Sequence, residues 1–375
     1  MTRALRPLLL ALLLLAGSGC GPAYGPEYLL ALRAGQRAYH AGRYEAAAGD
    51  FARAAGAATR IKDRDEARLL QARMNEKLDR FDHAAAIYRQ MVEDSPEGPR
   101  RVRAIFELCY LDIRNGAEAG WQALREAVLR YPNHGAARRA LALSVQHLAR
   151  TGGESAARAF LRTSLPRLAG TEAEQQAEYE LARSLERGGQ LAPAHDALVA
   201  TARAHPYPFG SLSDDALWRA SRIDETTGRY QHAIEDLREL LRSRETAAGG
   251  SYERPRFAPA QMRIAKLYRD RLRDAATARA ELRKVYTEHA NSNLADDAMW
   301  QEAVLWHEVG EAAQACALLD RLRRERPSSR YVRCGQLLCP GYTPPAGLRP
   351  CPRYIAEPEP EPEREREEGG GEDQP

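Results

Sequence analysis

Three stretches of the chain repeat one pattern of residues. They read GRYEAAAGDFARA at 42–54, DRFDHAAAIYRQM at 79–91 and GRYQHAIEDLREL at 228–240. Each begins with a turn residue, has an aromatic residue two positions later and an Ala three positions after that, and continues with apolar residues at helical spacing. Residues three and four positions apart share one face of a helix, so each stretch predicts a helix that packs along one side. The small Ala then allows a second helix to approach closely.

The spacing resembles the tetratricopeptide repeat, a 34-residue helix–turn–helix unit. Ala, Leu, Arg and Glu, which favour helices, dominate the rest of the body, and few β-branched runs alternate as strands would. Aligned on the repeat, the sequence holds about eight units, at 28–61, 65–98, 101–134, 138–171, 175–208, 214–247, 259–292 and 296–329. Gly152 stands at the turn of the fourth unit, and the seventh carries one extra residue near Tyr268. The resemblance implies an all-α fold, a right-handed superhelical solenoid of about eight TPR-like hairpins over 28–333.

In this family the first helix of each hairpin lines the inner, concave surface, which usually binds peptides or partner proteins. The fifth, ninth and twelfth positions of a unit point inward, and in three units they hold a large apolar residue, an Arg and a Glu. These candidate partner-binding residues are Leu69, Arg73, Glu76, Tyr179, Arg183, Glu186, Trp218, Arg222 and Glu225. Trp, Tyr and Arg often dominate binding energy at interfaces. Alternatively, each Arg pairs with the Glu three residues later, a contact that contributes only about 0.2–0.5 kcal/mol. Trp300 and Trp306 fit either the core or the groove.

The sequence contains no recognisable catalytic motif. His307–Glu308 lacks the second His of a zinc-binding helix, and there is neither a GxSxG motif nor a phosphate-binding loop. His83, His195 and His232 fall within predicted second helices, where an exposed position is favoured over metal ligation. We therefore expect a protein that is not an enzyme, without a cofactor and without a metal site.

Four cysteines near the end of the repeats predict covalent crosslinks. Cys334, Cys339 and Cys351 follow the last unit in a Pro-rich segment, 334–355, which is expected to cap the final hairpin. Outside the cytoplasm such a cluster favours at least one disulfide, and a cysteine left over can pair with Cys316. A zinc site is the alternative, although no CxxC pair and no nearby His accompany the cluster. Cys109 is expected to be a buried apolar residue.

Residues 1–19 have a basic start, a short apolar run and small residues before Cys20. The run is too short to span a bilayer and is typical of an export signal. It resembles a bacterial lipoprotein signal peptide, which implies that Cys20 is lipidated and that 20–27 links the lipid to the repeats. An ordinary secretory signal, cut nearby, is the alternative. Both interpretations predict that the remaining chain functions outside the cytoplasm.

The charge of the chain is unevenly distributed. The formal net charge is +3, but residues 356–375 contain nine acidic residues against two Arg, largely as alternating Glu and Pro. Such a tail cannot form a core and is predicted to be disordered, as a spacer, a lure for a basic partner or an inert end. The basic body has no run of cations interleaved with aromatics, so nucleic acid is not an expected partner.

Together these features resemble outer-membrane lipoproteins built of tetratricopeptide repeats, such as the TolA-binding coordinator and the lipoprotein of the β-barrel assembly machinery. The stretch LADDAMW at 294–300 resembles the unit starts of the TolA-binding type. The resemblance implies a non-enzymatic periplasmic adaptor, anchored to the outer membrane by lipid alone and binding envelope proteins or peptides through its concave surface. A module that positions a peptidoglycan-active enzyme is the alternative. Repeat positions encode packing, so they do not choose between these functions.

Overall fold

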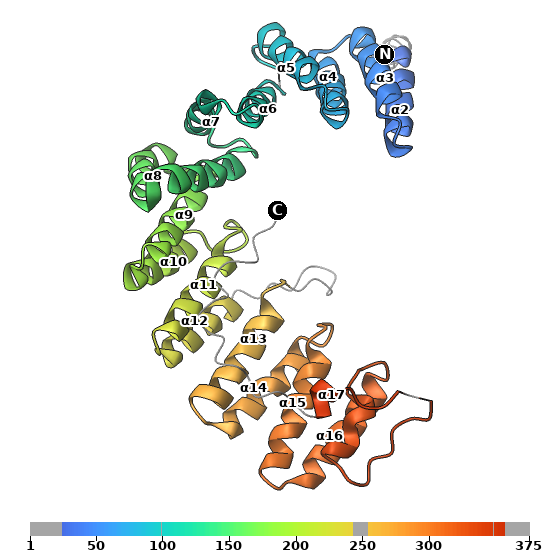
Figure 1. Cartoon of the computed structure of the whole chain (residues 1–375), viewed down its shortest axis with the longest axis vertical. Coiled ribbons are helices and arrows are strands. Elements are labelled where there is room, and N and C mark those ends of the chain that lie inside the picture. The colour runs from blue at the N-terminus through green and yellow to red at the C-terminus, as the bar shows by residue number, and fades with distance from the viewer. Residues whose placement is uncertain (1–24, 99, 243–253, 348, 357–375) are drawn as a thin grey trace, which may run out of the picture. The chain divides into compact units, whose positions relative to one another are not determined.

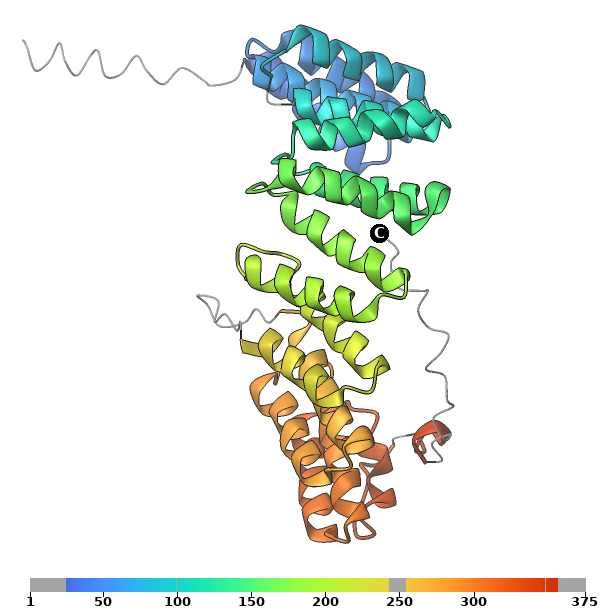
Figure 2. The same ribbon diagram turned by 90° about the vertical axis from the view of Figure 1, so that its left-hand side faces the viewer.

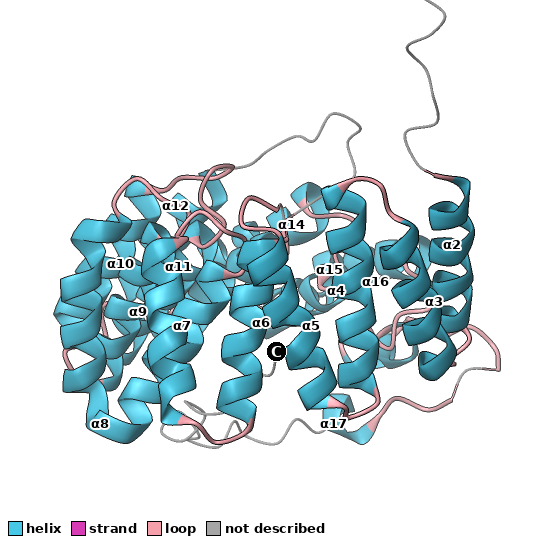
Figure 3. Ribbon diagram, turned by 90° about the horizontal axis from the view of Figure 1, so that it is seen from above, coloured by secondary structure: helices cyan, strands magenta, loops and turns pink. Residues whose placement is uncertain are grey.

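The computed structural model describes residues 25–98, 100–242, 254–347 and 349–356. These residues form helices and connecting turns, and no strand occurs among them (Figure 3). The chain divides into two compact units, one ending at Gly188 and the other beginning at Gly189. Within each unit, helices that are consecutive in the sequence lie side by side (Figures 1 and 2). The predicted signal peptide, Cys20 and the acidic tail beyond Ala356 lie outside the described residues.

The first unit is a row of antiparallel hairpins. In order they are α2 (Pro26–His40) with α3 (Tyr44–Ala57), α4 (Ile61–Lys77) with α5 (Phe81–Asp94), and α6 (Arg101–Arg114) with α7 (Glu118–Arg130). The next element, α8 (Ala137–Leu168), is a fourth hairpin, because its backbone leaves the helical conformation at Gly153, where φ is 73°. The turn is thus one residue later than the predicted Gly152. Helix α9 (Glu174–Arg187) completes this unit.

The second unit continues the pattern. It contains α10 (Leu191–Ala204), α11 (Ser213–Thr226), α12 (Tyr230–Arg242), α13 (Phe257–Lys266) with the π-helical turn η2 (Leu267–Arg271), α14 (Ala275–Glu288), α15 (Ala295–Glu308) and α16 (Ala312–Glu325). A short cap follows, with the 3-10 turn η3 (Val332–Leu337) and α17 (Arg353–Ala356). The predicted all-α array of paired helices is confirmed.

The small residues predicted at the repeat's close-packing position are buried. Seven alanines at the repeat's small position have exposed fractions of 0%, namely Ala47, Ala84, Ala157, Ala194, Ala233, Ala278 and Ala315. In the third hairpin Gly120 takes this position, and a Cβ there would come 2.8 Å from the backbone nitrogen of Ile113. Helices α6 and α7 therefore approach too closely for any side chain at that point.

The π-helical turn η2 coincides with the extra residue predicted near Tyr268. A π-helical turn holds one residue more than an α-helical turn, so it absorbs an insertion without ending the helix. Helix α14 can then pack on α13 in the ordinary hairpin arrangement.

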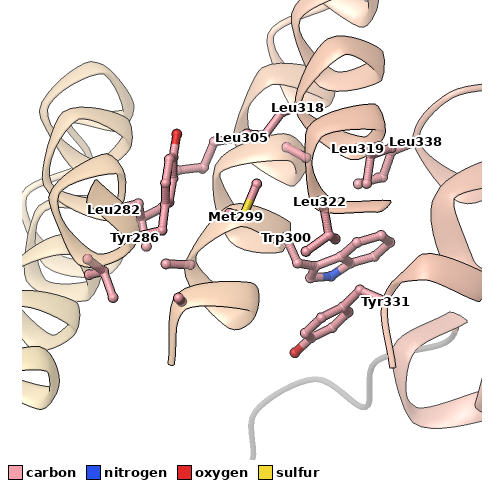
Figure 4. Close-up of a cluster of buried hydrophobic side chains, with 14 of the residues drawn as sticks. Leu282, Tyr286, Met299, Trp300, Leu305, Leu318, Leu319, Leu322, Tyr331 and Leu338 are labelled. Atoms are coloured by element: carbon pink, nitrogen blue, oxygen red, sulfur yellow. The ribbon is translucent and has the colours of Figure 1, made fainter. Parts of the chain in front are cut away.

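The core of the last hairpins extends into the cap (Figure 4). Trp300 stacks on Tyr331 with ring centroids 5.0 Å apart, so this Trp belongs to the core. The cysteines form two disulfides, Cys316–Cys339 and Cys334–Cys351, the first of which joins the cap to α16. Among the described cysteines only Cys109 keeps a free thiol, and it is buried. Its burial raises the pKa of that thiol to about 11.

Candidate functional site

In the first unit, the predicted partner-binding residues lie mostly in the seams between helices. Leu69 on α4 and Tyr179 on α9 are only 3% and 8% exposed. Leu69 packs in a core cluster with Tyr88 of α5. Neither residue therefore offers an open apolar anchor to a partner.

The charged residues of this predicted set are engaged as well. Arg73 lies 3.9 Å from Glu107 of α6, and Glu76 accepts a hydrogen bond of 2.6 Å from the hydroxyl of Tyr88. Arg183 lies 3.5 Å from Glu180, one turn before it, and its guanidinium is 5.9 Å from the centre of the Tyr179 ring. Glu186 is half-buried near the end of α9. Arg73 thus connects α4 to α6 and Glu76 connects α4 to α5, unlike the pairing within one helix considered as the alternative.

In the second unit, a more open surface surrounds Trp218 on α11. The guanidinium groups of Arg256 and Arg263 lie 5.3 and 5.4 Å from the centre of its ring. Glu225 accepts hydrogen bonds from Nε and Nη2 of Arg263, while Arg222 is exposed. We call Trp218, Arg222, Glu225, Arg256 and Arg263 the Trp218 patch. It brings an aromatic ring and three Arg together on the side of the first helices.

A groove of about 1090 Å³ lies in the same unit, lined chiefly by the second helices α10, α12 and α14. The groove was not predicted, because the resemblance to the repeat family points to the first helices as the binding surface. The lining carries charges of both signs, among them Arg203, Asp224, Asp236, Arg238, Glu239 and Glu281.

In the lining of this groove His195 of α10 meets two buried carboxylates. Its Nε2 lies 3.1 Å from Oδ2 of Asp236 on α12 and 3.5 Å from Oδ2 of Asp224 on α11. Its Nδ1 lies 3.2 Å from Oδ1 of Asp196, and Arg229 pairs with Oδ1 of Asp224. The hydrogen bond to Asp236 raises the pKa of His195 to about 9. We call His195, Asp224 and Asp236 the His195 cluster.

His83 and His232 are exposed, as predicted, but His195 is half-buried. The predicted exposed position is therefore wrong for His195. Asp236 is 41 residues away from His195 in the sequence, so their meeting requires α12 to face α10 across α11. No local pattern in the sequence indicates that Asp236, which stands beside the core residue Leu237, is buried near His195.

Two other buried carboxylates in this unit are fully partnered. Glu302 accepts hydrogen bonds from Arg283, Tyr286 and Trp306, at 2.5, 2.7 and 3.2 Å. Burial, together with the bond to Glu302, raises the pKa of Tyr286 to about 12. Glu281 accepts from Gln261 at 2.6 Å and from Lys284 at 2.9 Å. These networks join helices and leave no vacant oxygen for a ligand.

No described helix has both the length and the apolar character to cross a membrane.

Comparison with known proteins gives one family match. The model of the tetratricopeptide repeat matches residues 259–292, the range of the seventh predicted unit. No curated protein matches the chain.

Solved structures give weak likenesses. A repeat protein from Cytophaga hutchinsonii is 13% identical over 71% of this chain and 98% of its own, with a TM-score of 0.42. A tetratricopeptide repeat protein from Parabacteroides merdae is 10% identical over 73% of this chain and 98% of its own, with a TM-score of 0.37. A kinesin light chain-like repeat protein from Podosopora anserina is 18% identical over 52% of this chain and 96% of its own, with a TM-score of 0.36. One unit thus matches the tetratricopeptide repeat model, and the described helices pair around buried alanines in a TPR-like array.

Proposed function

We propose that this protein is a non-enzymatic adaptor that binds a partner protein of the bacterial envelope through the Trp218 patch. Repeat arrays offer extended surfaces for protein binding. The observation that carries the proposal is the half-buried Trp218 ring with the guanidinium groups of Arg256 and Arg263 at 5.3 and 5.4 Å from its centre, and with Arg222 exposed one turn away. Trp and Arg are the residue types that most often dominate interface energy.

The proposed location is the periplasmic face of the outer membrane, with lipid on Cys20 as the anchor. The lipoprotein-like signal at 1–19 supports this proposal. The two disulfides in 316–351 support it weakly, because disulfides persist mainly outside the cytoplasm.

The binding surface is tested by crosslinking in cells. A photoreactive residue is placed at Arg222, and as a control at Glu308, which is exposed on α15 away from the patch. We expect a discrete adduct from position 222 and a severalfold loss of it when Trp218→Ala is added. Equal adducts from both positions, or an adduct insensitive to Trp218→Ala, would contradict the proposed surface.

Mass spectrometry of the adduct names the partner. Capture of a peptidoglycan-active enzyme, with no turnover by this protein alone, would favour the alternative function of positioning such an enzyme. Radiolabelled palmitate tests the anchor separately: we expect label on the wild type and none on Cys20→Ser.

A further inference from the structure

The His195 cluster brings three potential metal ligands together from three different helices. The three ligand atoms, Nε2 of His195 and one oxygen each of Asp224 and Asp236, all lie within 4.8 Å of one another. Two of the separations are 3.1 and 3.5 Å. Ligands bound to tetrahedral zinc at about 2.0–2.2 Å are separated by about 3.3–3.6 Å. The spacing thus fits a zinc ion with only small shifts of the side chains.

One buried oxygen of Asp224 supplies a second observation, because it has no hydrogen bond among the described residues. The Asp224 side chain is fully buried, and its Oδ1 is paired with Arg229. Its Oδ2 points toward His195 but accepts no hydrogen bond from any described residue. Buried carboxylate oxygens normally have a partner, as those of Glu302 do. Oδ2 of Asp224 lies 3.5 Å from Nε2 of His195, so a cation held by the three side chains would complete the coordination of this oxygen.

The surroundings of His195 also match those of a metal-binding imidazole. Such an imidazole usually donates its second N–H to a carboxylate, which fixes the tautomer and orients the ring. Here Nδ1 lies 3.2 Å from Oδ1 of Asp196, and Nε2 faces the two buried aspartates. Arg229 holds Asp224 in the same way from the other side.

We propose that His195, Asp224 and Asp236 bind a divalent transition-metal ion, best matched by zinc. One imidazole and two carboxylates suit zinc, whereas calcium and magnesium prefer six or more oxygen ligands. Three protein ligands leave a fourth position, which opens to the groove between the second helices. A water or a side chain of a partner can occupy it. The site is independent of the Trp218 patch and of the adaptor function.

Zinc binding to the purified full chain tests the site. Protein stripped with EDTA is titrated with zinc at pH 7.5, and bound metal is measured by mass spectrometry and calorimetry. We expect one zinc ion per chain, with affinity at least about tenfold weaker in His195→Gln and Asp236→Asn. The matched control is His232→Ala, an exposed His that lines the same groove on α12, and it should bind zinc as the wild type does.

Cobalt gives a second readout that does not depend on affinity alone. Cobalt in a site with four or five ligands has strong visible absorption, which should appear with the wild type and disappear with His195→Gln. Circular dichroism establishes that each variant is folded. Absence of binding at micromolar zinc by folded wild type, or equal binding by His195→Gln, would overturn the proposal and leave the cluster as a proton-carrying ion network.

Discussion

Asp65 in the first unit and Asp224 in the second each have one carboxylate oxygen without a hydrogen bond among the described residues, but their neighbours differ. Both carboxylates are fully buried on a first helix, and each has an Oδ2 that accepts no hydrogen bond from the described residues. Burial is the largest cause of a raised pKa in each. Oδ1 of Asp65 accepts a hydrogen bond of 2.9 Å from the hydroxyl of Ser95. The backbone at Gly98 closes the space beside Oδ2 of Asp65. Asp224 instead faces His195 and Asp236.

The difference shows when a buried acid indicates a binding site. Among the described residues, no further metal-ligating group converges on Asp65, so protonation of the carboxylate can compensate for its unpaired oxygen. Asp224 meets two further ligand groups and opens to a groove, so a cation can do the same. Burial of a carboxylate alone is thus insufficient evidence for a metal site. A metal site also needs several ligand atoms close together, and in the His195 cluster three helices supply them.

The largest expected effect is the loss of stability on removing Glu302, a buried acid whose oxygens all have partners. It provides a reference for the two acids compared above. Glu302→Ala removes the acceptor of Arg283, Tyr286 and Trp306. We expect the free energy of unfolding to fall by about 3 kcal/mol, because the buried hydroxyl of Tyr286 and the half-buried Trp306 lose their acceptor. Urea unfolding measures it, with Glu308→Ala on the exposed end of α15 as the control. A loss no larger than that of the control would show that the network contributes little.

The second prediction concerns Asp224→Asn and separates stability from metal binding. Asn keeps an oxygen for Arg229 and removes a buried charge, so without zinc we expect a change within about 1 kcal/mol. Zinc at a hundred times its dissociation constant should stabilise the wild type by about 2.7 kcal/mol and the variant hardly at all. Thermal unfolding with zinc or EDTA measures both. A metal-free loss as large as that of Glu302→Ala would make Asp224 a structural residue.

The repeat packing could be predicted from sequence because its determinants are local. Ala233 lies five residues after Gly228, the spacing that also separates Ala47 from Gly42, and both alanines are completely buried. The insertion near Tyr268 could be predicted because the seventh unit has one residue more than the repeat spacing allows. It coincides with η2. Only the choice between adjacent glycines 152 and 153 was wrong, since either can adopt a positive φ.

The surfaces were less predictable because they depend on contacts between hairpins. Leu69 and Tyr179 occupy register positions that point inward in the family, yet neighbouring side chains cover them here. The His195 cluster requires three helices to be placed before its ligands meet, and no local pattern of residues encodes that distance. The role of the Trp218 patch in binding stays a prediction.

The smallest expected effect is a pH-dependent gain in stability from Asp65→Asn. It tests whether protonation compensates for the unpaired oxygen of Asp65. Burial raises the pKa of Asp65 above its usual value despite the attraction of Arg68 and Arg64. A carboxyl with a raised pKa in the folded state stabilises the protein below its unfolded pKa, and this contribution is lost as pH rises through the folded pKa. Asn cannot ionise and keeps an acceptor for Ser95, so the variant avoids that loss.

We therefore expect Asp65→Asn to be about 1 kcal/mol or less more stable than the wild type at pH 7, with the advantage gone at pH 4. Urea unfolding of both proteins at the two pH values measures the difference. The same advantage at pH 4 would mean that packing beside Gly98, rather than charge, is responsible. A clear loss at pH 7 would mean that the ionised carboxylate has a partner such as Arg68, and Asp65 would then resemble Glu302 more than Asp224.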